Sequence, residues 1–375
     1  MPFEESTRMD RRLEFVLLAR QEGANLRALC RRFGITPNTA YKWLARYQAE
    51  GVAGLADRSH RPHTSPRQAL PEDEAAVLAV RTTHPTWGGR KIRAWLQAHD
   101  HPAPAASTIT TILARHDRLT GPRAGEPQAY GRFEHPVPNA LWQMDFMGHR
   151  PLGCGRVHPL TVLDDHSRFA LGLFACAHEQ GPLVQTHLTT IFRAYGLPQA
   201  ILTDNGPAWG RSRPGVLTRL EAWLLQLGIG VWHGRFRHPQ TQGKVERWHG
   251  TIATDVFQFQ LFPDLAAAQT GFDAYRDEYN TDRPHEAIGL AVPASRYRVS
   301  DRSFPDPLPA IGYSDAHTVA TVTTGGWIWY AKRRIEVGEA LRGLPVGIRP
   351  TAEDGVFVVR FCDQDLKRID LRAAT

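Results

Sequence analysis

The hydrophobic period changes several times between residues 141 and 256, and the order of the changes restricts the fold. Residues 141–147 (LWQMDFM) alternate in period two, and two further apolar runs, 157–163 and 168–176, predict a hairpin. Helix-like and strand-like segments then alternate, in the order 183–195, 199–203, 215–227, 229–233 and a helix beginning near residue 243. Three strands followed by alternating helices and strands predict a mixed sheet with helices on both faces.

Three carboxylates stand at the predicted ends of these elements. Asp145 is the only charge in the first strand-like run, Asp204 follows the strand at 199–203, and Glu246 lies in the first turn of the last helix. A carboxylate in a first helical turn is usually a partner of the helix dipole, so Glu246 alone indicates little. The two aspartates at strand ends make a functional role for Glu246 more credible, because open α/β sheets place their binding and catalytic sites at strand ends. We therefore predict one cleft shared by all three.

The chemistry of such a cleft follows from its oxygen donors. Mg²⁺ or Mn²⁺ suits carboxylate ligands, and two ions about 3.5–4 Å apart can activate an attacking oxygen and stabilise a leaving one. Other carboxylates are poorer candidates. Asp164 and Asp165 fall in the hairpin turn, where Asp is expected for turn geometry, and Asp255 lies nine positions beyond Glu246.

Charge and composition indicate an anionic partner. The chain of 375 residues carries a formal charge of +7, and 40 of its 45 cationic side chains are arginine, which suits phosphate and guanine. A GC-rich genome would produce the same bias. Residues 1–70 hold 12 Lys and Arg against 7 Asp and Glu, so the excess is concentrated near the N-terminus. The sequence has no run of eighteen apolar residues, no secretion signal and no Cys-x-x-Cys, which predicts a cytoplasmic protein without a membrane span.

Residues 10–50 predict three short helices, of which the third begins at Thr36-Pro37, a cap followed by proline at the first helical position. Gly34 ends the second. The third helix has an outer face of polar and basic side chains, which are Asn38, Thr39, Lys42 and Arg46. This arrangement predicts a helix-turn-helix domain over residues 8–56 that binds DNA, with a generic three-helix bundle as the alternative.

A second helix-turn-helix unit is predicted over residues 70–118, after a linker rich in Pro and Arg. Its helices would span 72–83 and 90–98, with a last one capped by Ser107. The candidate DNA contacts, all expected to be exposed, are Arg90, Lys91 and Arg93.

Residues 265–279 predict the last helix of the core, and a tail follows it. Short β-runs at regular spacing predict a small β-barrel over 315–375, with strands at 318–323, 327–330, 333–337, 346–349, 356–361 and 366–370. Its basic strands are compatible with DNA contact and equally with protein docking.

Five blocks of sequence resemble, in order, the core blocks of bacterial insertion-sequence DDE transposases, a superfamily that includes retroviral integrases. They are WQMDF, TVLDDHSRF, LTDNGPAW, HPQTQGKVERWHGT and YNTDRPHEAIGL. The element order is that of a ribonuclease H-like core, which we expect over 137–300. The resemblance implies that Asp145, Asp204 and Glu246 form a DDE triad holding two Mg²⁺ or Mn²⁺ ions. The interval from Asp204 to Glu246 is longer than in many relatives, and we attribute the excess to residues 205–216.

The resemblance also implies a function. Such an enzyme binds the terminal inverted repeats of its element in double-stranded DNA, cuts a strand to expose a 3′-hydroxyl and joins that hydroxyl to target DNA. Two element ends need two active sites, so a homo-oligomer on DNA is expected, with no nucleotide cofactor. The candidate DNA contacts near the triad are Arg237, His238, Lys244 and His249. A domesticated DNA-binding regulator and a structure-specific ribonuclease are the alternatives, and the missing His/Cys zinc module disfavours a viral-type integrase.

Overall fold

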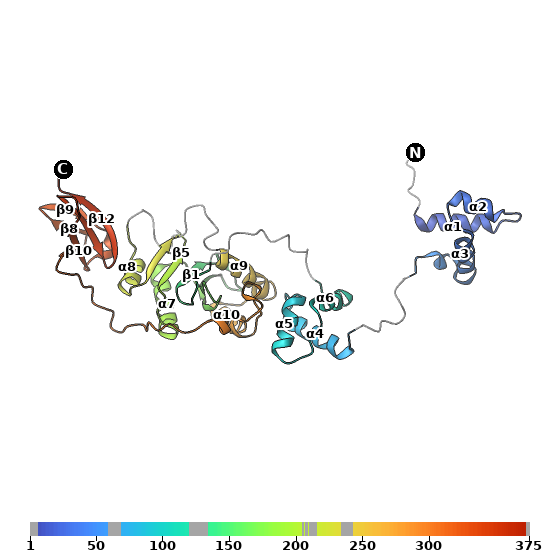
Figure 1. Ribbon diagram of the computed structural model, residues 1–375, viewed down its shortest axis with the longest axis horizontal. Helices are drawn as coiled ribbons and strands as arrows, with labels where there is room; N and C mark the ends of the chain where they lie inside the picture. Colours follow the sequence, from blue (N-terminus) through green and yellow to red (C-terminus); the bar gives the residue numbers. More distant parts are fainter. Residues whose placement is uncertain are drawn as a thin grey trace. The chain divides into compact units, whose positions relative to one another are not determined.

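The structure is a computed structural model that divides into two compact units, Met1–Gln68 and Ala69–Thr375 (Figure 1). It describes residues 7–58, 69–119, 134–204, 206, 209, 216–233 and 243–372. Within these ranges, no helix has the length and apolar character needed to cross a membrane.

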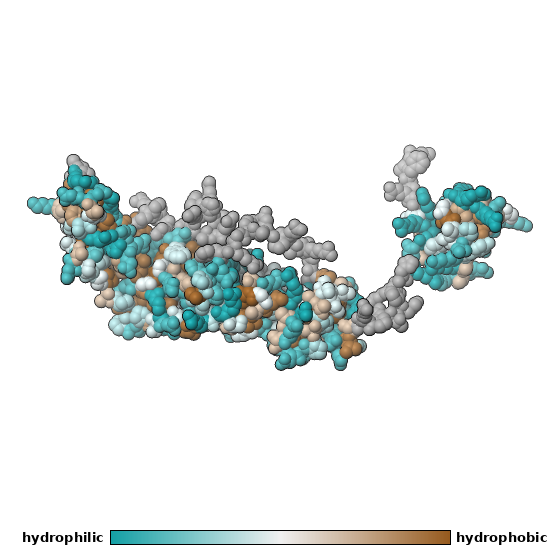
Figure 2. All heavy atoms as spheres, viewed as in Figure 1, coloured by the Kyte–Doolittle hydropathy of each residue, from teal (hydrophilic) through white to brown (hydrophobic). Residues whose placement is uncertain are grey.

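The first unit contains α1 (Arg8–Ala19), α2 (Leu26–Phe33), α3 (Pro37–Glu50) and a 3₁₀ turn, η1 (Gly51–Leu55). The predicted end and start signals are confirmed: Gly34 is left-handed at φ 64°, and the Thr36 side chain accepts the Thr39 N–H. A small core of Phe15, Val16, Cys30, Ala40 and Leu55 lies between the helices. On the face seen in Figure 2, the side chains of this unit are mostly hydrophilic.

The second unit begins with three more helices, α4 (Pro71–Thr83), α5 (Gly89–Ala98) and α6 (Ala106–Arg115). They enclose a core that includes Val77, Trp87, Ile92, Ile109 and Leu113. The predicted helices are confirmed within a residue or two, but the prediction that Ser107 caps the third is wrong. α6 begins at Ala106, two residues earlier than a cap at Ser107 implies, so Ser107 lies inside the helix and Ala105 holds the cap position.

A mixed sheet follows, as predicted, with the five expected strands and a short additional strand, β2, that the sequence does not predict. Its strands are β1 (Leu141–Phe146), β2 (Arg150–Pro151), β3 (Arg156–Asp164), β4 (Ala170–Cys176), β5 (Ala200–Thr203) and β6 (Gly230–His233). They lie in the order β2-β3-β1-β5-β6, and β4 pairs with β3. β3 is antiparallel to β1 and β4, whereas β1, β5 and β6 are parallel.

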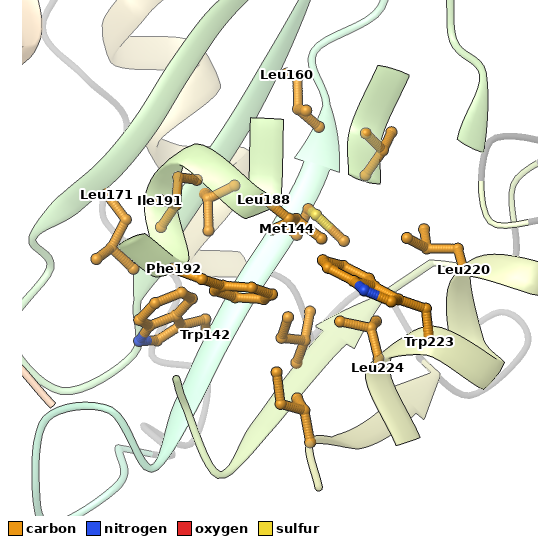
Figure 3. Packing of buried hydrophobic residues seen from close by; sticks show 14 of the residues in the cluster. Trp142, Met144, Leu160, Leu171, Leu188, Ile191, Phe192, Leu220, Trp223 and Leu224 are labelled. Atoms are coloured by element: carbon orange, nitrogen blue, oxygen red, sulfur yellow. The ribbon is translucent and has the colours of Figure 1, made fainter. Parts of the chain in front are cut away.

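Helices cover both faces of this sheet. α7 (Gly181–Tyr195) and α8 (Arg219–Gln226) pack on one face, where Trp142 and Met144 of β1 meet Leu188, Phe192 and Trp223 (Figure 3). The other face receives α9 (Gly243–Ile252), the π-helical segment η3 (Ala253–Phe257) and α10 (Leu265–Thr281). Side chains alternate along a strand, so Asp145 points away from the α7–α8 face, towards the face covered by α9 and α10.

Two short 3₁₀ turns, η4 (Glu286–Ile288) and η5 (Pro293–Arg296), lead towards the C-terminal region. This region contains β7 (Thr318–Thr321), β8 (Trp327–Tyr330), β9 (Arg333–Glu336), η6 (Glu339–Leu341), β10 (Pro345–Pro350), β11 (Val356–Phe361) and β12 (Gln364–Asp370). The six expected strands are present, but the barrel is not confirmed. The described strands form one four-stranded sheet, β12-β11-β10-β7, and a separate β8–β9 pair, so β12 and β7 remain edge strands.

Candidate active site

The pairing of β1 with β5 brings the two aspartates together. Leu141 pairs with Ala200 and Gln143 with Leu202, an offset of 59 positions (200 − 141). Asp145 and Asp204 have the same offset (204 − 145 = 59), so the register places Asp204 beside Asp145 just past the last paired residues. Neighbouring strands lie about 4.7–4.9 Å apart, and side chains at matched positions share a face. Both carboxylates therefore face the α9 side of the sheet.

Glu246 lies on α9, near enough to Asp145 for its charge to act on that carboxylate. Val245, Trp248 and Ile252 are buried against the sheet, and Glu246 is exposed in the first turn. Burial raises the pKa of Asp145 to about 7, and the negative charges of Asp204 and Glu246 add to this rise, while the Phe146 N–H opposes it. The three predicted residues are thus electrostatic neighbours.

The donor set fits a hard divalent cation. Carboxylate oxygens are the ligands that Mg²⁺ accepts while keeping several waters, and a bound cation would relieve the repulsion that raises the pKa of Asp145. Within the described residues, however, no three His, Cys, Asp or Glu side chains stand close enough together to hold a metal ion. The ligand chemistry is present, and side chains would have to move to complete the site.

Hydrogen bonds orient Asp204 at the end of β5. The Gly206 N–H donates to Asp204 Oδ1 at 2.9 Å. On the main-chain side, His233 Nδ1 lies 3.2 Å from the Asp204 carbonyl oxygen, and His233 Nε2 lies 2.7 Å from Glu221 Oε1. The sequence reasoning missed His233 and Glu221. The β5–β6 register, which sets His233 opposite Thr203, is a signal for His233 but not for Glu221 on α8.

His249, which the sequence predicts to contact DNA, lies half-buried against the sheet. Its Nε2 atom is 2.8 Å from the Thr161 hydroxyl, which in turn donates to the Asp145 carbonyl oxygen at 2.8 Å. Burial, and then the charge of Arg150, lowers the pKa of His249 to about 4. The ring is therefore neutral near pH 7 and bonded to the protein.

Lys244 is also bonded within the core. Its ammonium group pairs with Asp165, which is fully buried and accepts further hydrogen bonds from the Gln143 side chain at 2.7 Å and the His135 N–H at 2.8 Å. Asp164 is likewise buried and accepts the N–H and hydroxyl of Ser167. Both aspartates hold the turn after β3, in agreement with the turn assignment. The other two candidates near the triad, Arg237 and His238, and most of the 205–216 loop lie outside the described residues.

Two of the four candidate DNA contacts of α3, Lys42 and Arg46, lie near one aromatic ring, that of Trp43. Asn38 and Lys42 are exposed, and Thr39 and Arg46 are half-buried. The Arg46 guanidinium lies 5.2 Å and Lys42 Nζ 5.8 Å from the centre of the Trp43 ring. Cations stacked near an aromatic face keep their charge while their alkyl chains cover apolar surface.

The α4–α6 group is bound to the sheet domain through α5 and the loop before it. The Thr86 hydroxyl donates to Asp255 Oδ1 at 2.6 Å, and Trp95 Nε1 donates to Asp282 Oδ1 at 2.8 Å. Arg90 and Arg93 are exposed as predicted, with Arg90 3.4 Å from Glu286. The predicted exposure of Lys91 is wrong: the residue is half-buried, and this burial, with the charge of Arg283, lowers its pKa to about 8.

Family models match most of the chain in separate pieces. A helix-turn-helix domain matches residues 11–63 and a homeodomain-like domain residues 39–113. Integrase core domains match residues 135–239 and 227–293, and the C-terminal domain of IS481 family transposases matches 317–375.

Among known proteins, the uncharacterized 39.2 kDa protein of insertion element IS476 from Xanthomonas euvesicatoria is 26% identical over 67% of this chain and 72% of its own length. The 31.7 kDa protein of insertion element IS407 from Burkholderia multivorans is 28% identical over 42% of this chain and 55% of its own. A structure of the HTLV-2 integrase catalytic core domain in complex with magnesium aligns with 44% of this chain and 99% of that one, at 18% identity and a TM-score of 0.36.

The mixed sheet, the matched core domains and the helix-turn-helix domains define a protein with an integrase-type core and N-terminal DNA-binding modules. The similarity to insertion-element proteins and the match of residues 317–375 to the C-terminal domain of IS481 family transposases narrow the class of protein further. The chain carries the domain set of insertion-sequence transposases with an integrase-type core and is similar to proteins of bacterial insertion elements.

Proposed function

We propose that this protein binds the terminal inverted repeats of its own insertion element and catalyses metal-dependent DNA cleavage and strand transfer. The observation that carries the proposal is the common register of Asp145 and Asp204, with Glu246 raising the pKa of Asp145 from the helix above. This arrangement supports a phosphodiester-cleaving site in which acids from two strands and a helix would together hold two metal ions.

The roles of the residues follow from their positions. Asp145, Asp204 and Glu246 would hold two Mg²⁺ or Mn²⁺ ions, which when bound supply an activated oxygen nucleophile and a stabilised leaving oxygen. Asp145 must lose its proton to act as a ligand, and its raised pKa places that loss near neutral pH. The Gly206 N–H holds one oxygen of Asp204, which fixes how this carboxylate is presented.

The helical segments would bind the element ends. We propose residues 8–56 and 70–118 as end-binding domains, 137–300 as the catalytic domain and 315–375 as a C-terminal domain. Exposed Asn38 and Lys42 on α3, and Arg90 and Arg93 on α5, are suited to base edges and phosphates of double-stranded DNA. Since each of two ends needs an active site, the enzyme would act as a homo-oligomer assembled on DNA in the cytoplasm.

The test uses duplex oligonucleotides carrying the inverted repeats that flank the reading frame. The wild-type protein should cleave them with Mg²⁺ and join the exposed 3′-hydroxyl to a second duplex. Asp145→Asn and Glu246→Gln should abolish both steps and leave end binding unchanged in a gel-shift assay, because neither residue belongs to an end-binding domain. Asp273→Asn, an exposed change on α10, is the matched control. Full strand transfer by either triad variant would contradict the assignment.

One observation favours a second candidate, a DNA-binding regulator with an integrase-like scaffold. No three described side chains stand close enough to hold a metal ion without moving. Wild-type protein that binds the ends tightly but cuts none of them over a range of Mg²⁺ and Mn²⁺ concentrations would select this function.

A further inference from the structure

A short chain of hydrogen bonds joins the helix of Glu246 to the strand of Asp145. His249 lies three positions after Glu246 on α9, and residues at that spacing share a side of a helix. Thr161 of β3 pairs directly with Asp145 of β1, so the two side chains leave the sheet on the same face. The His249 Nε2 atom and the Asp145 carbonyl oxygen each lie 2.8 Å from the Thr161 hydroxyl oxygen.

The direction of these bonds is determined by their partners. A carbonyl oxygen can only accept, so the Thr161 hydroxyl donates its single proton to Asp145. The same hydroxyl must then accept from His249, which places a proton on Nε2 of the ring. The chain therefore runs one way, from His249 through Thr161 to the main chain of Asp145.

This chain is one of two polar connections that lie on either side of Glu246. Lys244, two positions before it, pairs with buried Asp165, and His249 binds Thr161, which is fully buried. Between them α9 rests on the apolar side chains of Val245 and Trp248. Apolar contacts are non-directional, whereas hydrogen bonds fix orientation and distance. The Lys244–Asp165 and His249–Thr161 interactions thus fix the position of Glu246 relative to the sheet.

We propose that His249 and Thr161 are positioning residues that set the separation between Glu246 and the Asp145–Asp204 pair, and through it the affinity of the site for divalent cations. The inference rests on the proposed function, because it assumes that these acids are ligands. Neither side chain is assigned a contact with DNA or with a reacting atom. Residues that orient ligands from behind typically change metal affinity about 10- to 100-fold when removed.

The experiment measures Mn²⁺ binding to the full-length, DNA-free protein by titration calorimetry. His249→Leu and Thr161→Val should each raise the dissociation constant about 10- to 100-fold. His249→Gln keeps an N–H donor and Thr161→Ser keeps the hydroxyl, so both should retain most of the affinity. Thr251→Val is the matched control, because the Thr251 hydroxyl bonds only to Arg247 O of its own helix among the described contacts, at 3.1 Å.

Cleavage of end-bearing duplexes gives a second readout. The Leu and Val variants should need more Mg²⁺ for half-maximal cleavage, approach the wild-type rate at saturating Mg²⁺ and bind ends normally. Thermal melting checks that both variants fold; if one of them unfolds, the other carries the comparison, because each removes the same His249–Thr161 hydrogen bond.

The outcomes separate this inference from the proposed function. Wild-type Mn²⁺ affinity in the Leu and Val variants would overturn the inference alone, and so would equal losses in the conservative and disruptive variants, since packing would then explain them. A wild-type protein that neither binds Mn²⁺ nor cuts DNA would overturn the proposed function and this inference with it.

Discussion

At the scale of single residues, Asp145 is the most perturbed acid of the site. Its pKa is about 7 in the folded protein against an ordinary value of 3.8, so between these values the folded state binds more protons than the unfolded chain. The contribution of this group to the free energy of unfolding therefore falls as pH rises through that window. Above about pH 7, where Asp145 is ionised in both states, the loss of stability is complete.

Asp145→Asn should remove this dependence. In metal-free buffer, the wild-type melting temperature should fall from about pH 5 to about pH 8 by more than that of the variant, because the variant has no carboxylate to ionise there. Thermal melting with a chelator checks this. Parallel pH profiles of the two proteins would show that Asp145 titrates normally.

The triad could be predicted from residue type and place, but several neighbours could not. Lys244 and His249 have the charge and position of DNA contacts, and only folding reveals that Asp165, 79 residues away, and Thr161, 88 residues away, are their partners. Lys91 is a similar case, since the acids whose charges act on it, Asp255 and Glu286, are distant in sequence. Local sequence contains no information on such pairings.

At the scale of elements, α5 crosses α6 closely at Gly89. A Cβ atom there would stand 2.4 Å from the Ala106 carbonyl oxygen and 2.7 Å from the Thr110 hydroxyl, and a backbone carbonyl cannot easily move away. At Gly88 a Cβ atom would meet nothing within 4 Å.

Gly89→Ala should therefore destabilise the α4–α6 group by about 1–3 kcal/mol, the usual cost of overpacking, and weaken end binding. Gly88→Ala, the matched control, should be close to neutral. Hydrogen exchange of the α5 and α6 amides in the full-length protein measures the difference. Equal protection in both variants would mean that the helices can separate without cost.

Elements with strong local signals were predictable. The Thr36 cap, the left-handed Gly34 and the period-two run of β1 lie where the sequence places them, because each is determined by neighbours a few residues away. The predicted barrel is not confirmed, because the closure of a barrel is not determined by neighbouring residues. Strand positions in the tail were predictable, but which strands pair depends on contacts between distant residues.

At the scale of the whole molecule, Asp255 connects three parts of the second unit. It lies on η3, directly after the helix of Glu246, and receives Thr86 from the loop before α5 at 2.6 Å. It also pairs with Arg283, which follows α10, at 3.1 Å, with side chains only 11% and 6% exposed. One half-buried carboxylate thus links a proposed end-binding domain to the segment that continues the helix of Glu246.

Asp255→Ala would leave Arg283 buried without this partner, a change that typically costs about 3–5 kcal/mol. We expect faster hydrogen exchange over residues 84–95 and slower end cleavage, with end binding by the first unit retained. Asp273→Ala, an exposed acid on α10, is the control. Unchanged exchange and cleavage in the Asp255 variant would show that the connection has no mechanical role.

The matched offset of β1 and β5 also bears on how such enzymes diverge. Each aspartate is located by the end of a strand. β2, β3, β4 and α7 lie between these two strands in the chain, and α7 with its loops only returns the chain from β4 to β5. Insertions in those loops would leave both acids in place, whereas a slip of β5 by a single residue would turn Asp204 to the opposite face. Evolution can therefore lengthen the interval between the acids freely, but it must preserve the phase in which their strands are paired.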